Sequence, residues 1–330
     1  MLKEGQSMCT TLIKIITLVF TSLALAGCLT KSKVVNLPDA ENQLFTTDGR
    51  YFVSGADSVF EITKSDNTFK KEPFGPKCNY AGLAQYKNYL LANCMEVKLI
   101  NAKKQIFFAE LVEGQLPEFQ ILADLSELSI PNGLAVKSTT ATGAELLIGN
   151  SNYFGAGSIS RLVIEDTEQG LSAMSLEKDY MAANHNVNGA NGLRMLGDTL
   201  YFTDFDSSSL RSRVAKVEFD LEGQPKEVQI LRDKVAIYDD LWPMCGGVLV
   251  ADYLGGRLIF INQDNDVFKS DSLQFPGASS VVLAQSNDFE KPTLLVTEKG
   301  ILLETGTPLG NQLSQVPLSA DLLEHVGCNL

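Results

Sequence analysis

The segment Leu200-Tyr201-Phe202-Thr203-Asp204 is a short apolar strand that ends in polar residues, and it has five counterparts elsewhere in the chain. A turn and another apolar strand follow each copy. The six copies are Tyr51-Phe52-Val53-Ser54, Leu90-Leu91-Ala92-Asn93, Leu147-Ile148-Gly149-Asn150, Tyr201-Phe202-Thr203-Asp204, Leu249-Val250-Ala251-Asp252 and Leu294-Leu295-Val296-Thr297-Glu298. Their closing polar residues lie between 39 and 57 positions apart, which is the period of a propeller blade of four short strands. The sequence therefore predicts an all-β fold, a six-bladed β-propeller with four-stranded antiparallel blades.

The N-terminus has the pattern of a bacterial lipoprotein signal. Residues 11–27 form an apolar run, interrupted by Lys14, that ends in Leu25-Ala26-Gly27-Cys28. Small residues before a cysteine predict cleavage after residue 27 and acylation of Cys28. A transmembrane anchor is the alternative, but from Ile15 the run is 13 residues long, whereas a spanning helix needs roughly 20. Leu29 after the lipidated cysteine favours the outer membrane, so we expect a protein of the bacterial cell envelope that faces the periplasm.

The rest of the chain is expected to form a polar tether over residues 28–40 and one propeller with a C-terminal tail over residues 41–330. The chain has 40 acidic and 27 basic residues and a formal net charge of −13, which repels phosphate backbones and argues against a nucleic-acid partner. An open ring would expose strand edges. Residues 34–37 or residues 316–318 are therefore expected to complete the last blade.

Four of the six cysteines remain once Cys9, in the leader, and the lipidated Cys28 are set aside. Cys78 and Cys94 each lie eight positions from Tyr86 in a predicted turn, so a hairpin there would place them opposite each other. In an oxidising compartment this spacing predicts a disulfide. The other two, Cys245 and Cys328, are either a second pair that ties the tail to the fifth blade or free thiols.

Oxygen-bearing side chains recur where the blades begin. Asn132, Asn191 and Asp239 each stand just before a hydrophobic first strand, and Glu41 has the corresponding place in the first blade. First strands line the central channel of a propeller, so these residues converge on its axis. Two carboxylates with two amide oxygens suit Ca²⁺ or another divalent cation. The alternative is that Asn-Gly here is only a turn dipeptide.

These blade openings resemble the regucalcin, gluconolactonase and luciferin-regenerating-enzyme family, within the wider group of calcium-dependent phosphotriesterases, paraoxonases and strictosidine-synthase-like proteins. The resemblance covers most of residues 41–305. It rests on three stretches: Pro131-Asn132-Gly133-Leu134-Ala135, Asn191-Gly192-Leu193 with the strand after it, and Asp239-Asp240-Leu241 with Leu249-Val250-Ala251-Asp252-Tyr253. It implies a six-bladed propeller whose divalent cation polarises the carbonyl of a small lactone or ester.

The same resemblance implies roles for individual residues. Asp239 would activate water as well as hold the cation, and Asp240 competes for that place. His185 corresponds to a channel base in paraoxonase-like members, although a lone histidine in a polar loop is more often only exposed. Two further candidates come from the residues themselves and not from the resemblance. Trp242, which adjoins Asp239, and Tyr153, in a glycine-flanked loop, are expected to line a substrate pocket; for Trp242 a role in the core or as a channel plug is equally open.

Two functions are therefore expected from the sequence. The first is a cation-dependent hydrolase acting on a small lactone or ester. The second is a non-catalytic propeller that binds an envelope protein, because propellers host many functions. No Gly-x-Ser-x-Gly elbow, His-Glu-x-x-His, Cys-x-x-Cys, Walker or dinucleotide glycine pattern occurs in the sequence, so these other chemistries are not indicated.

Overall fold

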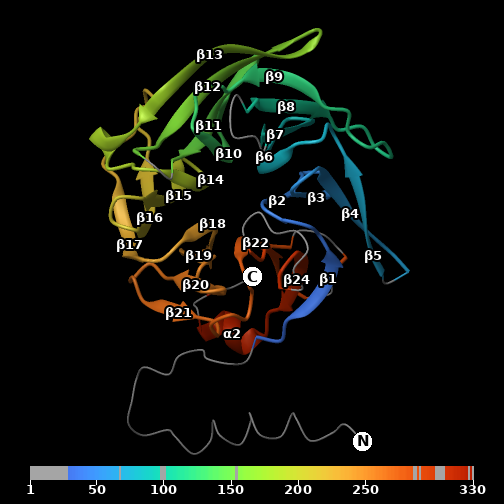
Figure 1. Cartoon of the computed structure of the whole chain (residues 1–330), viewed down its shortest axis with the longest axis vertical. Coiled ribbons are helices and arrows are strands. Elements are labelled where there is room, and N and C mark those ends of the chain that lie inside the picture. The colour runs from blue at the N-terminus through green and yellow to red at the C-terminus, as the bar shows by residue number, and fades with distance from the viewer. Residues whose placement is uncertain are drawn as a thin grey trace, which may run out of the picture.

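The computed structural model describes residues 29–66, 68–96, 102–152, 155–284, 288–289, 291–301, 309–325 and 328. Their strands form six antiparallel four-stranded sheets arranged around a central axis (Figure 1). The predicted six-bladed propeller is confirmed. Within these ranges the helices are short, a 3-10 turn at Ala183–His185 (η1) and α2 at Ala320–His325. None of the helices in this part of the chain is long and apolar enough to cross a membrane.

Each of the first five blades is built from four consecutive strands, with the first strand innermost. Blade one contains β2 (Gln43–Phe45), β3 (Tyr51–Ser54), β4 (Val59–Ser65) and β5 (Thr68–Phe74). Blade two contains β6 (Asn79–Tyr86), β7 (Tyr89–Met95), β8 (Lys104–Glu110) and β9 (Gln120–Asp124). Blade three contains β10 (Ile130–Thr139), β11 (Gly143–Ser151), β12 (Ser158–Thr167) and β13 (Gly170–Met181). Blade four contains β14 (Ala190–Leu196), β15 (Thr199–Asp206), β16 (Arg211–Glu218) and β17 (Gln229–Val235). Blade five contains β18 (Tyr238–Met244), β19 (Gly247–Asp252), β20 (Arg257–Ile261) and β21 (Val267–Lys269).

Blade six combines the two ends of the chain. Its inner strands are β22 (Ala278–Leu283), β23 (Thr293–Glu298) and β24 (Gln312–Pro317), and its outer strand is β1 (Ser32–Asn36). β1 pairs antiparallel with β24, and the blue N-terminal strand lies beside the red C-terminal one in Figure 1. Both segments proposed for closure therefore contribute. Residues 32–36, which fall within the expected tether, form the outer strand of this sheet, so β24 is paired on both sides.

The Asn-Gly pairs are neither turns nor hairpin tips but bulges inside the innermost strands. Pairing of β10 with β11 shifts between Pro131 and Leu134, and β6, β14, β18 and β22 have shifts at the corresponding places. The glycines allow neighbouring inner strands to touch. A Cβ on Gly133 would lie 2.1 Å from the Asn191 carbonyl oxygen. A Cβ on Gly192 would lie 2.6 Å from the Asp240 Cα.

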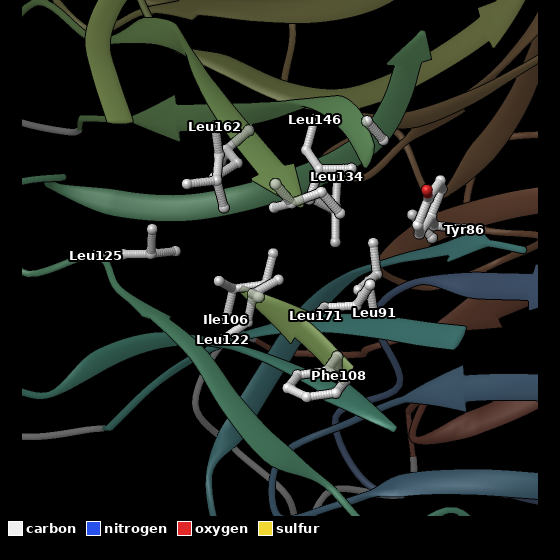
Figure 2. Close-up of a cluster of buried hydrophobic side chains, with 14 of the residues drawn as sticks. Tyr86, Leu91, Ile106, Phe108, Leu122, Leu125, Leu134, Leu146, Leu162 and Leu171 are labelled. Carbon is white, nitrogen blue, oxygen red and sulfur yellow. The ribbon is translucent and has the colours of Figure 1, made fainter. Parts of the chain in front are cut away.

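The hydrophobic core is divided into clusters that lie between neighbouring blades. Figure 2 shows the cluster between blades two and three, where leucines from both blades face one another around Ile106. Leu134, Leu146 and Leu162 from blade three are at most 1% exposed. Successive side chains of a strand point to opposite faces of its sheet. Each sheet lies between the two neighbouring blades, so apolar side chains on both of its faces are buried.

Two disulfides are present among the described residues. Cys78–Cys94 lies in blade two and Cys245–Cys328 joins the tail to blade five. The first was predicted, and the second settles an alternative that the sequence left open. Cys78 and Cys94 are not directly opposite, because the bulge in β6 shifts the register so that Cys94 pairs with Tyr80.

Candidate functional site

Polar side chains at the ends of the second strands connect each blade to the start of the next. Ser54 Oγ donates to the carbonyl of Ala81 over 2.6 Å, and Thr297 Oγ1 donates to that of Glu41 over 2.8 Å. The Asn93 amide and the Thr203 hydroxyl bond the carbonyls of Asn132 and Asp239 in the same way. Glu41, Asn132 and Asp239 therefore occupy equivalent points of the repeat, at the axial end of each blade.

Three acids and one lysine meet at this end of the channel, and we call Asp39, Glu41, Asp239 and Lys299 the axial cluster. Lys299 Nζ donates to Glu41 Oε2 and lies 3.6 Å from Asp39 Oδ1. All four residues are at most 8% exposed. The cluster joins three blades, because Glu41 precedes β2, Asp239 lies in β18 and Lys299 follows β23.

Burial dominates the acid–base behaviour of this cluster. It raises the pKa of Asp239 well above its ordinary range, and the nearby Glu41 carboxylate raises it further. Burial also raises the pKa of Glu41, while the Lys299 ammonium opposes that shift. Burial acts to lower the pKa of Lys299, but the attraction of Glu41 and Asp39 outweighs it and the net shift is upward. The site thus contains a carboxyl that retains its proton above the usual pH, beside a lysine that stays charged.

Asp240 has a different environment from its neighbour. Its Oδ2 accepts hydrogen bonds from Asn42 Nδ2 and Ser280 Oγ, each over 2.8 Å, and from Arg194 Nη2. Its Oδ1 accepts from the backbone N–H of Leu241 over 2.8 Å. These donors come from blades one, four, five and six, so Asp240 braces the ring. Both of its carboxylate oxygens already accept hydrogen bonds within the protein.

The residues that were expected to hold a divalent cation do not fit one in this arrangement. Asn191 Oδ1 is buried without a hydrogen-bond partner in the described part of the chain, as a free ligand oxygen would be. The Glu41 carboxylate, however, is paired with an ammonium, which would repel a second cation at the same oxygen. Among the residues with described placement, no three acidic, histidine or cysteine side chains are grouped to hold a metal ion.

The other expected site residues are dispersed. Asn132 lies near the start of β10, and its backbone carbonyl accepts a hydrogen bond from the Asn93 amide. His185 ends η1, where its Nδ1 lies 3.0 Å from Asn184 Oδ1; no contact in the described ranges joins it to the axial cluster. Trp242 packs against two hydrophobic clusters, beside blades five, six and one, which agrees with the core alternative. Tyr153 and Cys28 lie outside the described residues.

Sequence reasoning missed the basic residues of the site. Lys299 directly follows the sixth copy of the repeated phrase, and Arg194 follows Asn191-Gly192-Leu193 within an inner strand. A charged residue in a strand that lines the axis could have served as a signal. Neither lysine nor arginine recurs at that point of the other blades, so the repeat pattern gave no reason to select them.

Comparison with solved structures agrees with this architecture. The chain resembles an oxidoreductase described as a glucose dehydrogenase from Thermus thermophilus, with a TM-score of 0.62, 12% identity and coverage of 87% of this chain and 99% of that one. An aldose sugar dehydrogenase from Streptomyces coelicolor in its PQQ-bound form has a TM-score of 0.59, 12% identity and coverage of 88% and 98%. A gluconolactonase from Xanthomonas campestris has a TM-score of 0.56, 13% identity and coverage of 89% and 91%.

The likeness establishes the fold. At these identities it does not carry the activity of those proteins to this chain. No protein-family model matches the sequence, and no curated protein matches it either. The chain is thus a six-bladed propeller of the same architecture as these sugar dehydrogenases and the gluconolactonase.

Proposed function

We propose that the axial cluster is the active site of a hydrolase that acts on a small lactone or ester. The observation that carries this proposal is the buried Asp239 carboxyl beside the Glu41–Lys299 pair, at the point where inner strands converge. A buried carboxyl whose pKa is raised above its ordinary value is a stronger base than an exposed one and can both accept and return a proton. Perturbed groups of this kind gather at functional sites more often than elsewhere.

The residues divide the work in a simple way. Asp239 in its ionised form takes a proton from the attacking water, whose oxygen bonds to the substrate carbonyl carbon. Lys299 stabilises the negative charge that develops on the carbonyl oxygen, since an ammonium has three donors and Glu41 occupies one of them. The carbon–oxygen bond to the leaving group then breaks, and Asp239 returns the proton to that oxygen. Lys299 thereby takes the place that the sequence assigned to a divalent cation.

Hydrolysis of a panel of lactones and aryl esters by the full chain tests this proposal. Asp239→Asn should lower kcat about 10²-fold or more, as expected for the loss of a general base. Asp220→Asn, in an exposed turn, is the matched control and should leave kcat unchanged. Activity should also persist in chelator. Activity that disappears in chelator and returns with Ca²⁺ would restore the cation-dependent alternative and refute the role of Lys299.

A second candidate function rests on a different observation. Leu210, Val235, Leu254 and Leu273 are between 62% and 71% exposed, and they lie in blades four and five at the end of the strands where β18 begins. Exposed apolar side chains gathered on one face are typical of interaction surfaces. If no substrate of the panel is hydrolysed, binding of an envelope protein at this face becomes the better proposal.

We also propose that the propeller is attached to the bacterial cell envelope through lipid on Cys28, facing the periplasm and with the outer membrane favoured. Two observations support this. The described residues include the disulfides Cys78–Cys94 and Cys245–Cys328, which suit an oxidising compartment. The carbonyl of Leu29, the residue after the proposed lipidation site, accepts a hydrogen bond from Gln274 Nε2 over 2.8 Å, so residue 29 is held against the ring. Metabolic labelling with a palmitate analogue should mark the wild type and not Cys28→Ser; equal labelling of both would refute acylation there.

A further inference from the structure

A cavity of about 280 Å³ lies between blades four and five, away from the axial cluster. Its walls are the end of β17, the start of β18, the β19–β20 turn and β21. Four basic side chains and one acidic side chain line the cavity. The residues that decide its chemistry are Arg232, Lys234, Arg257, Lys269, Asp252 and the exposed Leu254.

The four basic groups are only partly neutralised. Arg257 Nε pairs with Asp252 Oδ2 over 2.9 Å, and Arg232 Nε donates to the neutral hydroxyl of Tyr238 over 2.7 Å. Lys234 and Lys269 form no side-chain hydrogen bond or ion pair with any described residue. A pocket with three uncompensated positive charges is unusual in a chain whose net charge is −13.

These cations act on one another across the cavity. Burial lowers the pKa of Lys269, and the charges of Arg232, Arg257 and Lys234 lower it further, while Asp252 opposes the shift without cancelling it. Like charges held together destabilise the folded state by Coulomb repulsion, which a bound anion relieves. The pocket is thus prepared for an anion rather than for a neutral sugar or a cation.

We propose that this pocket binds a phosphate ester, with Lys269, Arg232 and Lys234 around the phosphate oxygens. Arginine and lysine are the usual phosphate ligands in proteins. Leu254 and Val235, which are 62% and 71% exposed at the rim, would contact the apolar part of such an ester. The site is separate from the proposed hydrolase activity and does not depend on it.

The same chemistry has two sources, a soluble phosphate ester or the headgroup of a phospholipid. The second source needs its own measurement because Leu29, the residue after the proposed lipidation site, is hydrogen-bonded near the pocket wall. Leu273 N donates to the carbonyl of Gly255 in the pocket wall over 3.0 Å, and the next residue, Gln274, holds the carbonyl of Leu29. Leu29, the residue after the proposed lipidation site, is therefore linked to the pocket wall through Gln274 and Leu273.

Isothermal titration of the full chain in nonionic detergent tests the site with glycerol 3-phosphate at fixed ionic strength. Saturable binding is expected, and Lys269→Met should weaken it at least tenfold. Because Lys269 has no internal partner among the described residues, this change leaves the fold intact. Lys226→Met, in blade four outside the pocket and paired with Glu218 in an exposed position, is the control and should bind as the wild type does. The proposal is overturned if neither this titration nor the lipid measurement shows saturable binding. It is also overturned if Lys269→Met binds as well as the wild type in both measurements.

The lipid arm uses the same proteins in dodecylmaltoside micelles that contain phosphatidylglycerol or phosphatidylcholine. A rise in unfolding temperature with phosphatidylglycerol that Lys269→Met loses identifies the headgroup as the source. A response to glycerol 3-phosphate without a response to the lipid identifies a soluble ester. An equal rise in the wild type and in Lys269→Met assigns the lipid effect to other surfaces and counts against a headgroup in the pocket.

Discussion

The ammonium of Lys299, after the last inner hairpin, donates to the carboxylate of Glu41, before the first inner strand, across the seam where the ring closes. Both groups are buried, at 7% and 8% exposure. Removing one partner of a buried pair leaves an uncompensated charge, which costs far more than the pair itself contributes. The contact therefore makes two residues at opposite ends of the chain depend on each other.

Lys299→Met should destabilise the protein by about 3 to 5 kcal/mol, because Glu41 is then buried without its partner. Glu41→Gln together with Lys299→Met should recover much of that loss, since no buried charge remains at this position. Urea unfolding of the two single variants and the double variant measures the coupling. Additive effects in this cycle would show that the pair does not interact energetically.

Stability should fall as pH rises because of Asp239. Its pKa in the folded state lies above the ordinary value of 3.8, so between the two pKa values the folded state binds more protons than the unfolded state, and the free energy of unfolding decreases with pH. Asp239→Asn should remove this loss. In urea unfolding, the stability of the variant relative to the wild type should increase as pH is raised above the ordinary value of 3.8.

Asp206 supplies a control of opposite sign. Hydrogen bonds from Ser208 and Ser209 lower the pKa of Asp206 to about 2, so its contribution is present above the ordinary value of 3.8 and disappears as pH falls through about 2. Asp206→Asn should therefore be the less stable protein at neutral pH and converge with the wild type in acid. If both variants differed from the wild type in the same direction, the assignment of the Asp239 shift to burial would be wrong.

The Cys78–Cys94 bond should stabilise the domain by about 3 kcal/mol, the chain-entropy value for a loop of roughly 15 residues. The double variant Cys78→Ser with Cys94→Ser should show this loss in denaturant unfolding without reductant. In reductant the wild type and the variant should unfold at nearly the same midpoint, apart from the effect of the Cys245–Cys328 bond, which both lose. A variant as stable as the oxidised wild type would contradict the prediction.

Leu146→Ala should cost about 2 to 5 kcal/mol, because the side chain is fully buried between blades two and three and its removal leaves a cavity. Leu221→Ala is the matched control, since Leu221 is fully exposed in a turn. It should change stability by no more than about 0.5 kcal/mol. Thermal unfolding of both proteins is sufficient to separate the two effects.

The fold was predictable because the period of the repeat is a local property. The strand at residues 201–204 and its counterparts show their length, alternation and spacing directly in the sequence. The same pattern did not show what Ser54 or Thr203 does, because each hydroxyl binds a carbonyl in the next blade. A repeat indicates which positions are equivalent in the blades. It does not indicate which carbonyl of the next blade each hydroxyl binds, because that depends on how the blades pack in the closed ring.

The site was predictable only in part, for a related reason. Asp239 and Glu41 were found through their equivalent places, and the structure brings them together. Lys299 was not found, because it occurs once and breaks the repeat. In the structure it forms an ion pair with Glu41, one of the expected cation ligands. The sequence indicates turns or ligands at the Asn-Gly pairs, whereas their glycines serve the close approach of inner strands.

The outer strand of blade six comes from the start of the chain and its three inner strands come from the end, so the ring closes over more than 270 intervening residues. Contacts between such distant segments form late in folding, since the entropy of closing the loop must first be overcome. The earliest strand to leave the ribosome therefore waits for the latest. β24 is not available to pair with β1 until it has been synthesised, so the propeller can reach its native state only after that.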